Sequence, residues 1–165
     1  MTAYHLAQYN TARILAELDD PKMRGFVDNL DRINALADKA PGFVWRVQTE
    51  RGHSVDLRPY PDKKILITLS VWESVAAVRH FTYAAAGEHA GMLRQRDQWF
   101  EHPEGEYIAL WWIPAGTLPT VPQAVERLEH LRQFGPTPYV FNFKKTFAPP
   151  SDTPSPSTRT AGAVL

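Results

Sequence analysis

The 165-residue sequence contains no cysteine, so disulfides, thiol nucleophiles and thiolate metal sites are excluded. It has no excess charge of either sign, because 18 Lys and Arg balance 18 Asp and Glu. This balance gives no electrostatic reason to expect nucleic acid or an anionic membrane surface as a partner. No segment approaches the roughly eighteen consecutive apolar residues of a membrane-spanning helix. The first ten residues (MTAYHLAQYN) lack the basic and apolar regions of a signal peptide, so we expect a cytoplasmic protein.

Motifs for nucleotide binding and for hydrolysis are also missing. The sequence contains no GxGxxG, P-loop, GxSxG or paired acid motif. Its histidines are scattered, and none forms an HxxxH or HxH pair with an acidic partner, so we expect no metal site. Two classes remain: an oxygenase-like or isomerising enzyme without a bound nucleotide, or a small-molecule-binding dimer.

The length and composition of the chain fit one globular domain. Hydrophobic residues make up 44% of the chain and aromatic residues 12%, and five Trp are present. We place the domain at residues 1–147. Residues 148–165 are rich in Pro, Ser and Thr and have too little apolar surface to bury, which predicts a disordered tail.

Residue spacing predicts a mixed α+β fold. Alternating positions indicate strands, and apolar residues three or four apart indicate helices. The expected strands are 3–9, 43–49, 64–72, 107–114 and 139–147, and the expected helices are 23–39, a long one after residue 72, and one from 121 to about 134. A short helical turn is expected within 11–22, and Asp20-Pro21 should begin the next helix. The first six main elements follow the ferredoxin-like βαββαβ order, with an added αβ.

The strands also predict which surfaces are buried. In strand 64–72 one face is aliphatic, whereas Leu66, Thr68, Ser70 and Trp72 form a mixed face. Strand 107–114 (YIALWWIP) is apolar on both faces. Because this strand has more apolar surface than one layer of helices covers, we expect a homodimer.

The best candidate for chemistry is the segment 71–100, in which a strand end runs into a long amphipathic helix. Stepping by three and four from Val78 reaches Thr82, His89, Arg96 and Trp99 on one face. That face should point toward the sheet, so His89 and Arg96 should point inward. An inward imidazole serves as a base, a haem ligand or a hydrogen-bond partner of a substrate. The alternative for His89 is a structural bond to a backbone carbonyl or to Ser70.

Arg96 needs an acceptor if it is buried, either a carboxylate, several carbonyls or an anionic ligand. Asp97 and Glu101 are close in sequence but on other faces of the expected helix. The alternative is that Arg96 lies at the edge of the core and extends into solvent. On helix 23–39, Asn34 falls on the buried stripe, and we expect its amide to bond a neighbouring backbone carbonyl.

Aromatic and hydroxyl side chains predict a binding wall. An aromatic wall with a few hydroxyls suits a flat apolar ligand. The candidate substrate-binding residues are Thr68, Ser70, Trp72, Met92, Trp99 and Trp112. Ordinary core and dimer packing is the alternative explanation for most of these aromatics.

Several stretches together resemble a bacterial family of uncharacterised domains in the dimeric α+β barrel superfamily. They are FVDNLDRINALADKAPGFVWR (26–46), SVWES (70–74), LRQRDQWFE (93–101), LWWIPAG with LPT (110–120), and ERLEHLRQFGPTP with FNF (126–143). The superfamily also contains antibiotic-biosynthesis monooxygenases and haem-degrading monooxygenases. The resemblance covers residues 4–147 and leaves out the tail.

The resemblance implies a dimeric α+β barrel, in which two sheets pack face to face and each protomer keeps a cavity between its sheet and helices. It also implies a monooxygenase-like enzyme acting on an aromatic or apolar small molecule. Such an enzyme would use either no cofactor or a haem bound by His89, because an inward histidine on this helix often lines the pocket of related monooxygenases. The competing function is a non-catalytic small-molecule-binding or scaffold homodimer in which His89 is structural.

Overall fold

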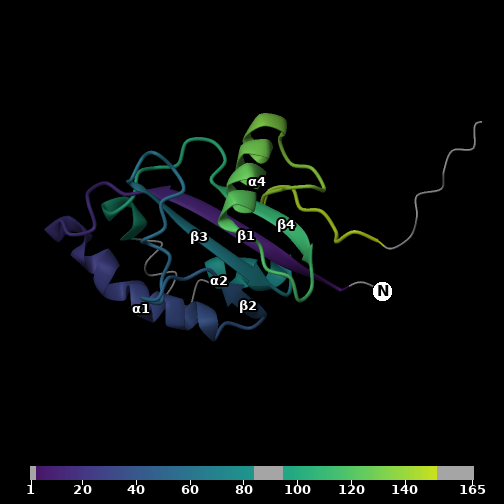
Figure 1. Cartoon of the computed structure of the whole chain (residues 1–165), viewed down its shortest axis with the longest axis horizontal. Coiled ribbons are helices and arrows are strands. Elements are labelled where there is room, and N and C mark those ends of the chain that lie inside the picture. The colour runs from purple at the N-terminus through teal and green to yellow at the C-terminus, as the bar shows by residue number, and fades with distance from the viewer. Residues whose placement is uncertain (1–2, 84–94, 152–165) are drawn as a thin grey trace, which may run out of the picture.

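The computed structural model describes residues 3–83 and 95–151. Its centre is one antiparallel sheet with the strand order β2-β3-β1-β4 (Figure 1). The strands are β1 (Tyr4–Arg13), β2 (Phe43–Arg46), β3 (Ile65–Trp72) and β4 (Ile108–Pro114). This order confirms the ferredoxin-like arrangement predicted from the sequence, because the first and third strands are neighbours at the centre.

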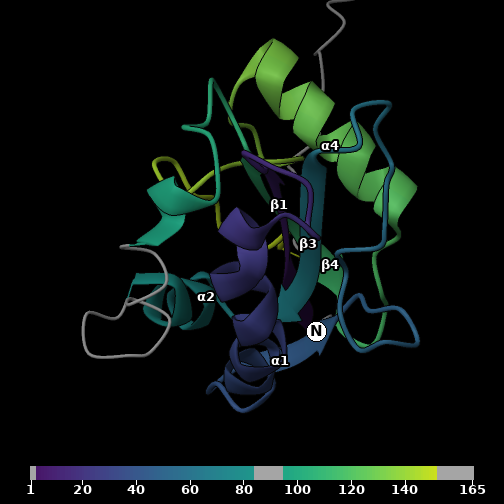
Figure 2. The same cartoon turned by 90° about the vertical axis from the view of Figure 1, so that its left-hand side faces the viewer.

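Helices cover both faces of the sheet. The helices are α1 (Arg24–Asp38), α2 (Val75–Tyr83) and α4 (Val121–Phe134), with short 3₁₀ turns η1 (Pro21–Met23) and η2 (Arg96–Gln98). Figures 1 and 2 show α1 and α2 on one face of the sheet and α4 on the other. None of the helices in the described residues combines the length and apolar character that spanning a bilayer requires.

The aliphatic face of the sheet packs against α4. Leu128 and Leu131 of the helix are buried against Tyr9, Leu69 and Trp111, all 2% exposed or less. Strand β4 therefore has one face on α4 and the other toward α2 and residues 141–147. A single chain covers both faces of β4, which removes the physical reason given above for a dimer; the dimer itself stays a prediction.

Helix starts follow the sequence signals. The Asp20 side chain accepts a hydrogen bond from the Lys22 amide and begins η1, which leads directly into α1. Thr120 and Gln123 form a reciprocal capping box at the start of α4, where each side chain bonds the other residue's backbone N–H. Both caps confirm the predicted helix starts at residues 21 and 121.

Two elements differ from the prediction. β1 continues through Arg13, where the sequence suggested a helical turn, because residues 10–13 pair with β3. The predicted last strand 139–147 is a single bridge between Phe141 and Leu110. The Asn142 side chain accepts hydrogen bonds from the amides of Lys144 and Lys145, which turns the chain away from the sheet.

The segment predicted to form a long helix after residue 72 is described at its two ends, and the far end differs from the prediction because Phe100 forms a bridge with Ile14. α2 ends at Tyr83, and η2 begins at Arg96. His89 and Met92 lie between them, outside the described residues, as does the predicted tail from residue 152 onward. The domain boundary at residue 147 is not tested.

Candidate functional site

A cavity of about 320 Å³ lies between the sheet and the two helices α1 and α2. It separates two apolar clusters on this face of the sheet. Met23, Phe26 and Trp99 belong to one cluster, and Trp72 and Val78 to the other. Aromatic and aliphatic residues from both clusters form the walls of the cavity.

The floor of the cavity is polar because of the alternation in β1 and β3. Gln8 lies opposite Ser70, and Asn10 lies opposite Thr68, so four polar side chains share the face between the clusters. Thr68 is exposed in the middle of a central strand. Apolar helix side chains gain little by packing on such a floor, which explains why the space remains open.

A chain of hydrogen bonds fixes part of this floor. The Trp72 Nε1 donates to the Ser70 Oγ at 2.9 Å, and that hydroxyl donates to the Gln8 Oε1 at 2.8 Å. The Gln8 amide nitrogen has no partner in the described part of the chain. Trp72 and Ser70 are thus held in position, and the donor at the end of the chain stays available.

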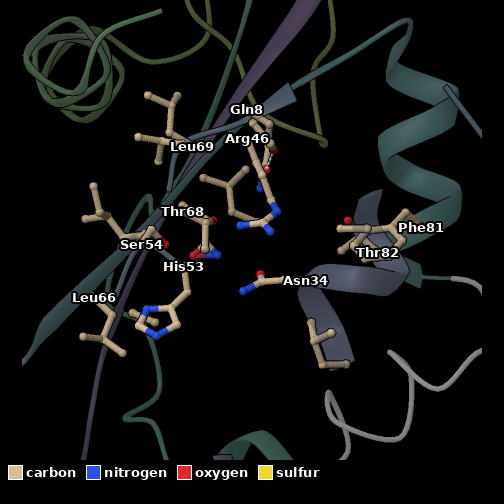
Figure 3. A pocket seen from close by; sticks show the side chains of 18 of the residues that line it. Gln8, Asn34, Arg46, His53, Ser54, Leu66, Thr68, Leu69, Phe81 and Thr82 are labelled. Carbon is tan, nitrogen blue, oxygen red and sulfur yellow. Dashed lines mark hydrogen bonds between the residues drawn. The ribbon is translucent and has the colours of Figure 1, made fainter. Parts of the chain in front are cut away.

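Asn34 reaches into the cavity from α1 (Figure 3). The sequence predicts a bond between its amide and a backbone carbonyl. Instead, its side chain forms no hydrogen bond with any described residue. The prediction was wrong because the face of the sheet opposite α1 is hollow at this point, so no carbonyl comes within reach.

Arg46 places a guanidinium in the same space from β2 (Figure 3). Its Nε donates to the Asp38 Oδ1 at 2.7 Å, and its second terminal nitrogen donates to Asp38 Oδ2 at 3.2 Å. The other terminal nitrogen donates to the Gly52 carbonyl at 2.7 Å. Asp38 therefore compensates the charge of Arg46 from the end of α1.

Arg96 and Trp99 line the opposite end of the cavity. The Arg96 guanidinium lies over the rings of Phe100 and Tyr107, 5.8 and 5.4 Å from their centroids. Trp99 is 4% exposed and packs against Phe26. Arg96 is half-buried and lines the cavity, so its inward position agrees with the predicted one.

His53 and Ser54 also line the cavity, and sequence reasoning missed both (Figure 3). The Ser54 hydroxyl donates to the Ile67 carbonyl at 2.7 Å and ties the loop to β3. The His53 Nδ1 is buried, has no hydrogen-bond partner and lies 4.0 Å from Asp56 Oδ2. No periodicity in the loop between β2 and β3 could have indicated these positions.

The predicted site residues fall into three groups. Thr68, Ser70, Trp72, Arg96 and Trp99 line the cavity. Trp112 does not: its Nε1 donates to the Phe147 carbonyl at 2.8 Å, because residues 141–147 cover this end of β4. His89 and Met92 lie outside the described residues, so their predicted roles are not tested.

No cluster of His, Asp or Glu among the described residues is arranged to hold a metal ion. A haem is also a poor match for this cavity. Its volume of about 320 Å³ is near the lower end of the range for ligand pockets, roughly 300–1,000 Å³. That size suits a molecule of two or three fused rings better than a porphyrin.

The model of a family described as a domain of unknown function, DUF3291, matches residues 5–157. The chain belongs to this family. The match confirms the resemblance to uncharacterised domains, and it extends beyond residue 147. No curated protein matches the DUF3291 chain.

Solved structures with a similar arrangement share little sequence with this DUF3291 chain. One is SnoaB, a cofactor-independent oxygenase from Streptomyces nogalater, with 16% identity and a TM-score of 0.45 over 73% of this chain and 99% of that one. Another is a protein of unknown function from Nitrosomonas europaea, with 12% identity and a TM-score of 0.42 over 73% and 99% of the two chains. A third, from Pseudomonas aeruginosa, has 12% identity and a TM-score of 0.39 over 71% and 97%.

Proposed function

We propose that this chain is a monooxygenase-like enzyme that acts on an aromatic, mainly apolar small molecule in the cavity between the sheet and α1 and α2. The observation that carries the proposal is the contrast between the cavity's walls and its floor. Phe26, Trp72 and Trp99 offer flat apolar surfaces, whereas the floor offers amide and hydroxyl groups. A fused-ring molecule with one or two polar substituents matches both.

Without a cofactor, the substrate itself must supply the electrons that reduce dioxygen. The substrate is a phenol whose keto tautomer carries a CH₂ group. A base removes a proton from it, and the resulting anion transfers an electron to O₂. Recombination forms a carbon–oxygen bond, and loss of water leaves a carbonyl. The balance is CH₂ plus O₂ giving C=O plus H₂O, so one oxygen atom enters the product and the other leaves as water.

Among the described residues, His53 is the imidazole that lines the cavity. We assign it the role of proton acceptor, because a neutral imidazole that reaches the substrate can serve as a general base. His89 keeps its predicted role as a base or haem ligand, and Arg96 keeps its predicted place in the site. The amides of Asn10 on the floor and of Asn34 on α1 would hold the polar edge of the substrate.

The test measures oxygen uptake and incorporation of ¹⁸O from ¹⁸O₂ with a panel of naphthols and hydroxylated tricyclic aromatics. We expect uptake that requires the protein and a product carrying one labelled oxygen atom. Thr68→Phe should abolish uptake by filling the cavity, and Thr117→Phe, at a turn outside it, is the matched control. His53→Gln should reduce the rate while ligand binding persists.

The competing function, a non-catalytic binding or scaffold homodimer, predicts a different result. Members of the panel would then raise the melting temperature in a Thr68-dependent way without any oxygen uptake. For protein purified from haem-supplemented cells we expect no Soret band. A Soret band that is lost in His89→Ala would instead support the haem-dependent version.

A further inference from the structure

The charged side chains that line the cavity among the described residues are both arginines. They are Arg46 and Arg96, and no carboxylate lines this part of the structure. We infer that the cavity takes an organic acid bound as its anion, with Arg96 as the counter-ion. This inference rests on the proposed function, because it specifies the class of molecule that the same cavity binds.

Arg96 has no carboxylate partner among the described residues, unlike Arg46. Among the described residues, the three carboxylates that follow Arg96 in the sequence contact other groups: the Asp97 Oδ1 lies 3.7 Å from His102 Nε2, the Glu101 carboxylate pairs with Arg13, and the Glu106 Oε1 accepts from Asn142 Nδ2 at 2.8 Å. Within the described residues, the Arg96 guanidinium lies over the faces of two aromatic rings. No side chain or carbonyl in this part of the chain accepts a hydrogen bond from its N–H groups.

Arg46 differs because Asp38 and the Gly52 carbonyl already satisfy it. The excess positive charge of the cavity thus lies at the Arg96 end. A half-buried guanidinium stacked on rings is weakly hydrated, and it binds an oxygen anion in its plane more strongly than a neutral acceptor. Phe100 and Tyr107 hold that plane in place before any ligand arrives.

The other residues that line the cavity also favour a planar acid as the ligand. The free Gln8 amide nitrogen and the side chains of Asn10, Asn34 and Thr68 have no partners among the described residues and supply further donors. Trp72 and Trp99 supply flat apolar contact. The ligand class is therefore an aromatic acid, whose anionic oxygen belongs to either a carboxylate or an acidic phenol.

The experiment compares 2-naphthoate with its neutral isostere 2-naphthamide. Binding is followed by quenching of tryptophan fluorescence, since two Trp line the cavity. We expect the wild-type protein to bind the acid about tenfold more tightly than the amide, the difference typical of a charge-assisted contact. A third probe, 2,4-dinitro-1-naphthol, carries its charge on a phenolic oxygen and distinguishes the two sources of the anion.

Three variants test the role of Arg96. Arg96→Met should remove the preference for the acid, and Arg96→Lys should keep part of it. Arg127→Met is the matched control, because Arg127 also stacks on aromatic rings but lies on α4, on the far face of the sheet. Asn10→Asp adds a negative charge to the floor and removes one amide donor, so it should weaken naphthoate binding much more than naphthamide binding.

The outcomes separate this inference from the proposed function. Equal binding of acid and amide by the wild-type protein would overturn the inference and leave the proposed function standing. A preference that survives in Arg96→Met would also overturn it. Binding of none of the three probes would overturn both, whereas a preference for the acid that Arg96→Met abolishes and Arg127→Met retains would establish the inference.

Discussion

Tyr9 illustrates how burial determines the chemistry of a single side chain. It lies beneath α4, is fully buried, and donates its hydroxyl proton to the Tyr60 hydroxyl at 3.1 Å. Burial, and then the hydrogen bond to Tyr60, raise the pKa of Tyr9 far above its ordinary value of 10.0. Burial also raises the pKa of Tyr60. Both phenols are therefore neutral in the folded protein at physiological pH.

This pair predicts sensitivity to alkali. Below the ordinary pKa both tyrosines are protonated in the folded and unfolded states, so they contribute no pH dependence. Above it the unfolded chain ionises at Tyr9 while the folded protein does not, so the free energy of unfolding falls as pH rises. The free energy of unfolding, obtained from urea melts at several pH values above 10, should fall less steeply with pH in Tyr9→Phe. The difference between the two slopes should reach up to about 1.4 kcal/mol per pH unit. Equal slopes would contradict the raised pKa.

Two asparagines show the difference between a satisfied amide and an available one. Asn142 is 6% exposed and bonds two backbone amides and the Glu106 carboxylate. Asn34 bonds no described residue and faces the cavity. One amide therefore belongs to the fold and the other is available to a ligand.

Replacing each asparagine by leucine should separate these roles. Asn142→Leu should lower the free energy of unfolding by about 1–3 kcal/mol, because it leaves backbone amides without acceptors. Asn34→Leu should change it by less than about 0.5 kcal/mol or raise it, since leucine adds apolar contact in a helix. Urea melts measure both. A large loss in Asn34→Leu would mean that the Asn34 amide is structural.

At the scale of elements, pairing partners override local preference. Residues 10–13 are followed by a helix-like stretch, yet they extend β1 because β3 offers a complementary edge from Ile65 to Thr68. Residues 139–147 read as a strand, yet Asn142 turns them after one bridge. The sequence signals that the structure confirms are those whose hydrogen bonds join residues close in sequence, such as the caps of η1 and α4.

The capping box of α4 gives a prediction at this scale. Thr120→Ala removes the side-chain acceptor of the Gln123 amide and should lower the free energy of unfolding by about 1 kcal/mol. Thr120→Asn, which can still cap the helix, should retain most of that stability. Thermal or urea melts distinguish the two variants, and equal losses in both would show that the cap is not the cause.

Considered as a whole, the molecule has its apolar sheet face covered by its own helix α4 (Figure 2). Packing of two sheets face to face, as the resemblance implies, would need α4 to lie elsewhere. Burial at this contact is nearly complete, since Ala124, Leu128 and Leu131 are at most 1% exposed. The homodimer remains a proposal, and a second copy is not needed to cover this face.

This coverage predicts how stability depends on protein concentration. Because α4 of the same chain covers the sheet, each copy should unfold on its own, and the urea midpoint should change little between about 1 µM and about 50 µM. Light scattering on the same samples reports the oligomeric state directly. A midpoint that rises with concentration would show that the fold is completed by a partner copy, as the predicted dimer requires.

The spacing of residues along the sequence was sufficient to predict which side chains share a face of a strand or a helix. Alternation in β3 placed Thr68, Ser70 and Trp72 on one face, and that face lines the cavity. Helical spacing placed Val78 and Thr82 there as well. Helix starts at Asp20 and Thr120 followed from caps that bond within a few residues. These features depend only on the backbone geometry of a single strand or helix.

Tertiary structure alone decided which of these faces meet and which stay open. It brought His53 and Arg46 to the cavity from the region of β2 and its loop, and it covered Trp112 with residues 141–147. It also left Asn34 without a hydrogen-bond partner among the described residues. It also placed α4, rather than the surface of a second molecule, on the aliphatic face of the sheet. These outcomes depend on contacts between segments far apart in the sequence, and periodicity within one segment contains no information about its distant neighbours.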